Sequence, residues 1–400
     1  MNIKKFLSNL VLFNLLVLII SFGITKYFDY KISHSIPRFE KQQEIEFTKR
    51  IDNLYPNGSV TSEGWARHPI WNYKREYIKS SKLWIKEWDF YITYIEKYDI
   101  WFSITISDLG YCSLIALSFT DCKINKYNHA EDLSLFSLGS LNLPSNTIKD
   151  YKFVHKGKNL NVTVTKIKEQ KTIHIQSNFF ELPNGEKGID INLGIIQSSL
   201  TESLNRQTTW AHNRNLFYLN EKINGMVANK GYYKFGKSIY EIININNNYT
   251  DNIFTSLDWG KGVWAYKSSW FWGVATKYID GKKIGFNLGY GYTDKSPATE
   301  NCIYYDDKVH KLDNVVFYAP NNGKDICNKD KPWEVKSDDN RVNLKFWPKI
   351  NRHKKFNFII ISNEQNQVFG YYEGFLILDN GQKIVIKKMN GFVEMYNNNW

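Results

Sequence analysis

Residues 162–175 read VTVTKIKEQKTIHI. Apolar and polar side chains alternate in residues 162–164 and again in residues 173–175, on either side of polar residues around positions 169 and 170. Alternation with a period of two is typical of a strand with one buried face. This stretch therefore predicts two strands joined by a tight turn.

The same pattern extends over most of the chain from about residue 84 onward. Three residue pairs mark further hairpins, because asparagine, aspartate and glycine tolerate the positive φ angles of tight turns: Asn184-Gly185, Asp280-Gly281 and Asn380-Gly381. No long segment with a helical period of 3.6 follows residue 60. Many short strands with regular turns predict an all-β chain, built as antiparallel barrels or sandwiches.

The N-terminus differs from the rest of the chain. Lys4 and Lys5 precede an apolar run of 19 residues, from position 6 to 24, close to the roughly 20 residues that span a bilayer. We expect residues 1–26 to be a transmembrane anchor or a signal segment, and residues 27–60 to be a spacer. A buried core helix is the third interpretation.

The side of the membrane depends on which charges are counted. The short basic start favours export, so we expect a membrane-anchored protein with its body outside the cytoplasm. Four cations after the apolar run would favour a cytoplasmic body instead: Lys26, Lys31, Arg38 and Lys41.

Composition excludes several function classes. The net charge is +12, but it is spread as single lysines, which indicates a solvated surface and no nucleic-acid partner; attraction to anionic lipid is the alternative. The eight histidines are scattered and no C-x-x-C pair occurs, so we expect no metal and no cofactor. The four cysteines would form two disulfides in an exported chain, or remain free thiols.

One motif is misleading. Residues 231–238, GYYKFGKS, match the phosphate-loop pattern letter for letter. That pattern binds phosphates only where a strand leads through a glycine-rich loop into a helix. The residues that follow are β-branched, so we expect a strand–turn–strand corner at Gly236 instead.

Aromatic residues are concentrated in residues 257–276, LDWGKGVWAYKSSWFWGVAT, which hold four tryptophans and one carboxylate, Asp258. A cavity lined by rings with a few polar groups is the usual form of a small-molecule site. We expect these rings to line one barrel, with Asp258 near a strand end, Trp270 and Trp272 on a shared face, and other rings between the barrels.

Two carboxylates are the candidate catalytic residues. A carboxylic acid in apolar surroundings has a raised pKa and can donate a proton, so Asp258 and Glu300 are predicted as general acids. The alternative is that such polar residues cap turns or strand ends. The predicted ligand-binding residues are Asp108, Trp259, Trp264, Trp270, Trp272, Asn287, Asn301, Gln367 and Glu394.

An ordered series of motifs resembles the bacterial domain-of-unknown-function 2804 family over roughly residues 60–400. The motifs include LDWGKGVWAYKSSWFWG (257–273), FNLGYGYTDKSPATEN (286–301), KPWEVKSDDNRVNLKFWP (331–348), NQVFGYYEGFLILDNG (366–381) and NGFVEMYNNNW (390–400). The family's signature positions correspond here to Asp258, Trp259, Trp264, Asn287, Glu300, Asn301, Gln367 and Glu394. Members commonly carry Gln-His-Gln before Val-Phe-Gly, whereas this chain has Asn366 in the middle, which puts a proton-carrying histidine in doubt.

The resemblance implies an architecture similar to the carotenoid-hydratase and tocopherol-cyclase group, with two lipocalin-like antiparallel barrels in tandem behind the N-terminal apolar helix. We expect the first β-domain at residues 61–209 and the second at 210–400. A weak internal repeat agrees with a duplicated unit, since residues 184–194 (NGEKGIDINLG) echo residues 280–289 (DGKKIGFNLG).

The sequence leaves three functions open. The first is binding of a lipophilic small molecule in a barrel cavity, by a protein held at a membrane by its N-terminal helix. The second is a hydratase- or cyclase-like acid catalyst that acts on an isoprenoid or another lipid. The third is a carbohydrate-binding or structural surface protein with exposed aromatic platforms.

Overall fold

The computed structural model describes residues 16, 20, 43–242, 244–245, 248–249, 252–358 and 361–399. The predicted N-terminal helix and most of the predicted spacer lie outside the described residues. Among the residues that are described, none belongs to a helix with the length and hydropathy of a membrane span.

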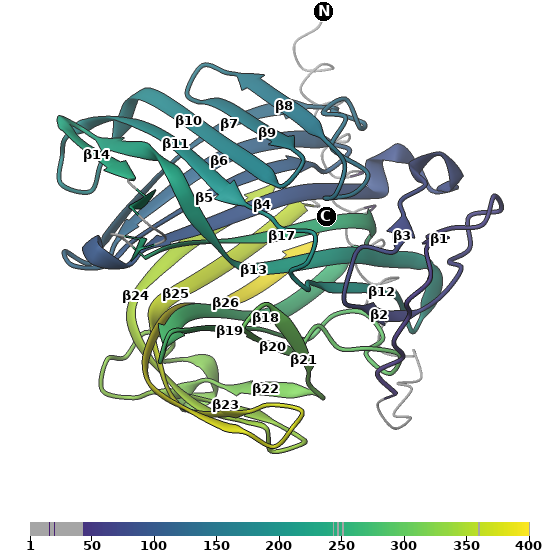
Figure 1. Ribbon diagram of the computed structural model, residues 1–400. Helices are drawn as coiled ribbons and strands as arrows, with labels where there is room; N and C mark the ends of the chain where they lie inside the picture. Colours follow the sequence, from purple (N-terminus) through teal and green to yellow (C-terminus); the bar gives the residue numbers. More distant parts are fainter. Residues whose placement is uncertain are drawn as a thin grey trace, which may run out of the picture.

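Two large antiparallel sheets follow one another along the chain and curl into half-barrels (Figure 1). The first sheet runs in the order β7 (Lys126–Leu135), β6 (Cys112–Asp121), β5 (Ile100–Asp108), β4 (Ile85–Ile95), β17 (Ile253–Val263), β13 (Asn213–Phe235), β11 (Lys187–Ile196), β10 (Gln170–Glu181), β9 (Asn161–Ile167) and β8 (Tyr151–Lys156). Strands β12 (Leu204–Trp210) and β14 (Ser238–Ile242) also pair with β13, and β2 (Gly64–Ala66) pairs with β12.

The second sheet holds the C-terminal strands. Its order is β21 (Lys308–Lys311), β20 (Cys302–Tyr305), β19 (Lys282–Tyr290), β18 (Lys267–Ile279), β26 (Lys383–Asn399), β25 (Ile361–Ile377), β24 (Val342–Phe358), β23 (Trp333–Ser337) and β22 (Val315–Tyr318). Short pairs and 3₁₀ turns complete the described chain: β1 (Ile51–Asp52) with β3 (Trp71–Asn72), β15 (Asn244–Ile245) with β16 (Asn248–Tyr249), η1 (Arg75–Tyr77), η2 (Lys82–Trp84), η3 (Glu96–Tyr98) and η4 (Pro320–Gly323).

The predicted all-β fold of two tandem lipocalin-like antiparallel barrels or sandwiches is confirmed, in the form of two curled half-barrel sheets. The alternating stretch at 162–175 forms β9 and the start of β10, which pair through a turn that includes Lys168 at φ 53°. Positive φ angles also occur in the three predicted turns, at Gly185, Asp280, Gly281 and Gly381. Residues 231–238, which match the phosphate-loop pattern, form the β13–β14 hairpin, with Gly236 at φ 60°. This is the strand–turn–strand corner that the β-branched residues after the motif predicted.

The chain passes from the first sheet to the second between Val263 and Lys267, because β17 still pairs with β4 and β13 whereas β18 pairs with β19 and β26. The predicted domain division at residues 209 and 210 stays a prediction, although this change of sheet falls later in the chain. The crossing matters for the site, since the tryptophan-rich stretch 257–276 contributes one strand to each sheet.

Each half-barrel has its own apolar core, and the two share a third. The shared core joins aromatic and aliphatic side chains from both sheets: Ile92, Tyr94, Trp101 and Phe254 from the first, and Trp272, Val274, Ile350, Phe369 and Phe392 from the second. In Figure 1 the long strands β24, β25 and β26 extend to the first sheet. All four cysteines are free thiols, so the disulfide alternative is not realised.

Candidate functional site

A cavity of about 220 Å³ lies between the two half-barrels; we call it the inter-sheet cavity. Its walls come from β4, β5, β6, β13 and β17 of the first sheet and from β18, β24, β25 and β26 of the second. The aromatic side chains that line it are Trp88, Phe90, Tyr218, Trp264, Trp270, Trp272, Tyr292 and Tyr396. Three rings of 257–276, Trp264, Trp270 and Trp272, therefore line a space between the two half-barrels, whereas the sequence predicted that the rings of this stretch would line one barrel.

Six of the predicted site residues line this cavity. They are Asp258, Trp264, Trp270, Trp272, Glu300 and Glu394. Trp270 and Trp272 share a face of β18, as their spacing predicted. Neighbouring rings pack closely, since Trp270 stacks on Tyr396 with centroids 4.3 Å apart and Trp264 lies 5.4 Å from Tyr292.

Asp258 lies in the middle of β17, not near a strand end as expected. Its cross-strand partner on β13 is Lys222, whose Nζ is 2.8 Å from Asp258 Oδ2. The hydroxyl of Tyr218 donates a hydrogen bond of 3.3 Å to Oδ1. Burial raises the pKa of Asp258 and outweighs the lowering by Lys222. The carboxyl is thus held in a setting that favours its protonated form more than water does.

Glu300 reaches the same region from the loop before β20. Asn220 Nδ2 donates a hydrogen bond of 2.9 Å to Glu300 Oε2, and the cations of Arg206 and Lys222 each lie 3.9 Å from that oxygen. A Cβ on Gly289 would come within 2.1 Å of Glu300 Oε1. The absence of a side chain at position 289 therefore makes room for this carboxylate.

Glu394 approaches the cavity from β26. Trp270 Nε1 donates to Oε1 at 3.0 Å, and Gln365 Nε2 donates to Oε2 at 2.8 Å. Burial raises the pKa of Glu394. The nearby cation is Arg352, which donates to Gln367 Oε1 at 2.6 Å and whose pKa burial lowers to about 10.

Three predicted residues lie outside the cavity lining and form hydrogen bonds with the residues that line it or with their neighbours. Asn287 accepts from Trp272 Nε1 at 2.8 Å and donates to the Glu300 carbonyl at 2.7 Å. Asn301 accepts from the Gly289 amide at 2.7 Å. Gln367 lies between Arg352 and Glu394. These side chains position cavity residues but do not line the cavity.

Two predicted residues lie elsewhere. Asp108 accepts from the Gly110 and Gly139 amides and from the Ser137 hydroxyl, so it organises a turn. Trp259 follows Asp258 on β17 and faces the opposite side, where it packs in the core of the first half-barrel. Their side chains do not line the inter-sheet cavity.

Asn366, which stands where family members commonly carry a histidine, lies on the face of β25 that points away from the inter-sheet cavity. Gln365 lines the cavity and Gln367 hydrogen-bonds Glu394, whereas Asn366 accepts from Asn351 Nδ2 at 2.8 Å. Side chains alternate along a strand. A histidine at position 366 would therefore not face the inter-sheet cavity.

Sequence reasoning missed the cations and the tyrosines. Lys222, Arg352, Tyr218, Tyr292 and Tyr396 all line the cavity, and none was singled out. A signal for two of them was present: Tyr218, Asn220 and Lys222 recur every second residue on one strand and all three contact a site carboxylate. The tyrosines belong to the same buried environment, which raises the pKa of Tyr218 and of Tyr292.

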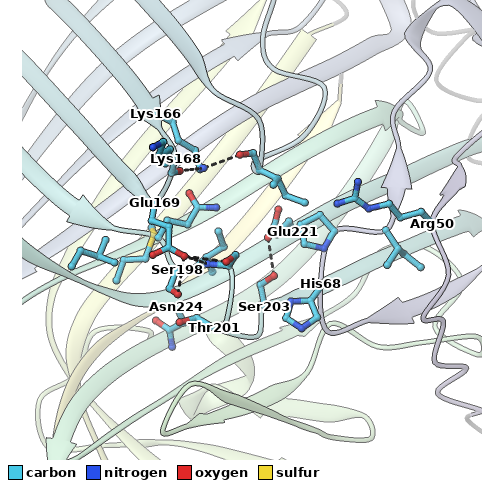
Figure 2. A pocket seen from close by; sticks show the side chains of 18 of the residues that line it. Arg50, His68, Lys166, Lys168, Glu169, Ser198, Thr201, Ser203, Glu221 and Asn224 are labelled. Carbon is cyan, nitrogen blue, oxygen red and sulfur yellow. Dashed lines mark hydrogen bonds between the residues drawn. The ribbon is translucent and has the colours of Figure 1, made fainter.

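A second cavity, of about 540 Å³, opens at the first half-barrel (Figure 2). Figure 2 shows Lys166 and Lys168 on one side and Arg50 and His68 on the other, with Glu221 between them. Glu221 accepts a hydrogen bond of 2.7 Å from Ser203, and burial raises its pKa. No predicted site residue lines this cavity.

Comparison with known proteins gives one family and a general likeness of architecture. A family model described as "Domain of unknown function (DUF2804)" matches residues 44–400. Among curated proteins, none matches this chain. Kievitone hydratase from Nectria haematococca is similar in structure, with 12% identity, 78% of this chain and 88% of that chain covered, and a TM-score of 0.45. CghA is also similar, with 9% identity, 88% and 97% covered, and a TM-score of 0.45.

Proposed function

The chain belongs to the DUF2804 family, and we propose that it binds a lipophilic small molecule in the inter-sheet cavity. The observation that supports this proposal is the convergence of eight rings, from both half-barrels, on one space. Apolar walls with a few placed polar groups are the usual build of a small-molecule site. Each well-stacked ring contact would add about 0.5–1.5 kcal/mol beyond the burial of apolar area.

The polar groups would orient the ligand. Asp258 with Lys222 lies at the first sheet, and Glu394 with Trp270 and Gln365 lies at the second. A ligand with a double bond, a ring or a polyene chain would present its faces to the tryptophans. Its oxygen functions would hydrogen-bond to the carboxyl and amide groups.

The pairing of buried carboxyls with rings favours a second candidate function, acid catalysis on such a ligand. Desolvation raises the pKa of both Asp258 and Glu394, so each carboxyl is protonated over a wider pH range than in water, and a protonated carboxyl can transfer its proton to a double bond. The carbon that receives the proton leaves a cation on its neighbour. In a hydratase, water would then add to that cation, and the resulting oxonium would return a proton to the carboxylate. In a cyclase, an internal double bond would add instead, and the final cation would lose a proton from an adjacent carbon to the carboxylate.

We also propose that the N-terminal apolar run holds the body at a membrane, with the body outside the cytoplasm. This part of the proposal rests on the sequence of residues 1–26 alone. A membrane supply of ligand would suit a cavity of this composition.

Native mass spectrometry of the full chain, extracted from the membranes of its own host in an amphipathic polymer in place of detergent, tests the binding proposal. We expect an apolar compound to co-purify, and to be lost in Trp272→Ala, which removes a cavity wall. Trp347→Leu is the matched control, because Trp347 is half-buried on β24 outside this cavity. An empty chain that also takes up no hydrophobic dye would contradict the proposal.

Once the compound is identified, two substitutions separate catalysis from binding. Asp258→Asn and Glu394→Gln keep the shape of each side chain but remove its acid proton. Loss of turnover with retained binding would support acid catalysis. Full turnover by both variants would exclude these two carboxyls as the acid.

A further inference from the structure

Three cross-strand rows on one face of the second sheet lead away from the inter-sheet cavity. Neighbouring residues on β18, β26 and β25 form them: Trp272, Glu394 and Gln367; then Trp270, Tyr396 and Gln365; then Ser268, Asn398 and Asn363. Positions two apart on a strand face the same side. The first two rows combine rings with a carboxyl and amides, whereas the third row is entirely polar.

The third row opens into a third hollow, of about 680 Å³, which we call the polar groove. Tyr292 and Asn363 line both the inter-sheet cavity and the groove, so the two spaces are neighbours. The groove is lined by amides and hydroxyls: Ser268, Ser269, Thr293, Asn357, Ser362, Asn363, Asn397, Asn398 and Asn399. Trp210 and Tyr292 supply its rings.

Neutral polar groups dominate the lining of the groove. Its carboxylate, Glu364, is held by Lys355 at 3.0 Å and by His353 at 3.1 Å, and Lys267 is a further lysine of the lining. Amides and hydroxyls both donate and accept hydrogen bonds, as the hydroxyl groups of a sugar do, whereas phosphate and carboxylate groups are usually recognised by arginine forks. Asn398 is 5% exposed, and its Nδ2 has no hydrogen-bond partner among the described residues.

The size of the inter-sheet cavity indicates that its ligand continues outside. Its volume of about 220 Å³ is below the roughly 300–1,000 Å³ of sites that enclose a whole drug-sized ligand. A short apolar chain or one ring system would fill it. The remainder of a larger ligand would meet the next polar row, which is the row of Asn398.

We propose that the ligand is an amphiphile whose apolar part occupies the inter-sheet cavity and whose neutral, hydroxyl-rich head, such as a sugar, occupies the polar groove. This inference rests on the proposed binding function and adds the class of head group to it. Asn398 and Asn363 hydrogen-bond the head, and Tyr292 contacts both parts.

Calorimetric titration of the full chain, held in an amphipathic polymer in place of detergent, tests the inference with three probes that share one alkyl chain. They are n-octyl β-D-glucoside and n-octyl phosphate, each below its micelle concentration, and 1-octanol below its solubility limit. We expect the glucoside to bind about tenfold more tightly than either of the others, the effect of one or two hydrogen bonds. Asn398→Ala should remove that advantage and leave octanol binding unchanged, and Asn363→Ala, at a residue that lines both spaces, should also remove the advantage. Asn343→Ala, on an exposed position of β24, is the control that should behave as the unmodified chain.

The outcomes separate this inference from the proposed function. Equal binding of octanol and glucoside, unaffected by the asparagine variants, overturns the head-group assignment and leaves the cavity as a lipophile site. Tightest binding of octyl phosphate overturns the neutral head. No binding of any probe overturns both proposals. Asn363 is only half-buried, so Asn363→Ala keeps the test decisive if Asn398→Ala fails to fold.

Discussion

Lys222 and Asp258 are direct cross-strand partners on β13 and β17, and the lysine Nζ lies 2.8 Å from the aspartate Oδ2. Their side chains are 5% and 12% exposed, so the pair is nearly withdrawn from water. The ammonium of Lys222 also lies over the ring of Trp272, 4.5 Å from its centroid. One lysine of the first sheet thereby contacts both a carboxyl beside it and a ring of the second sheet.

Substitution of Lys222 alone should lower the free energy of unfolding more than substitution of both Lys222 and Asp258. In Lys222→Met the buried carboxyl of Asp258 loses its cation, and breaking a buried pair from one side costs about 3–5 kcal/mol. We expect urea unfolding to show a loss of that order. The double variant Lys222→Met with Asp258→Leu should recover part of it, because neither charge is then left alone. A single variant as stable as the unmodified chain would show that the pair is not buried in solution.

The hairpins, and the residues that share a strand face, could be predicted from the sequence because they depend on neighbours within a few positions. Trp270 and Trp272 have the predicted shared face, and Gly236 forms the predicted corner. Alternation also separates Asp258 from Trp259. These local rules do not say which strand lies beside which.

The position of the cavity follows from pairings between distant parts of the chain, and the sequence does not show them. Leu257 pairs with Tyr91, and Asp258 with Lys222, across long sequence separations. Because β17 inserts between β4 and β13, Asp258 becomes a mid-strand residue of the first sheet, while Trp270 belongs to the second. The sequence also does not distinguish Arg352 and Lys222 from the other dispersed lysines and arginines, because only strand pairing between distant segments brings them to the cavity.

Glu300 depends on the missing side chain at position 289. In Gly289→Ala the new Cβ would lie 2.1 Å from Glu300 Oε1, so the carboxylate must move away from Asn220. Overpacking of this kind costs about 1–3 kcal/mol. We expect a lower midpoint of urea unfolding in Gly289→Ala.

The same substitution in a Glu300→Ala background serves as its control. In that background the alanine at position 289 meets no carboxylate. The loss of unfolding free energy caused by Gly289→Ala should therefore be well under half of its value in the unmodified chain. An equal cost in both backgrounds would mean that the strain arises from the backbone of β19 and not from Glu300.

Thiol accessibility gives an independent check of the fold. Cys112, Cys122 and Cys302 are buried and Cys327 is half-buried. Burial also raises the pKa of Cys302 to about 12 and the pKa of Cys112 to about 11, which suppresses the reactive thiolate. We expect a disulfide reagent at pH 8 to modify Cys327 first in the native chain, and all four thiols after denaturation without reductant. Fewer than four thiols in the denatured chain would reveal a disulfide.

The raised pKa of Glu394 predicts a pH dependence of stability. Burial raises this pKa in the folded chain above the roughly 4.3 of an unfolded glutamate. The folded state therefore binds the proton more tightly, and this contribution is fully present below the unfolded pKa and is lost as the pH rises through the folded pKa. Glu394→Gln resembles the protonated acid and lacks this titration. The free energy of unfolding of the unmodified chain, relative to that of Glu394→Gln, should fall as the pH rises from about 4 toward neutral. Urea unfolding of both chains between these limits measures the difference. A relative stability that increases with pH would mean that Arg352 and the donors from Trp270 and Gln365 outweigh burial and hold the carboxylate ionised.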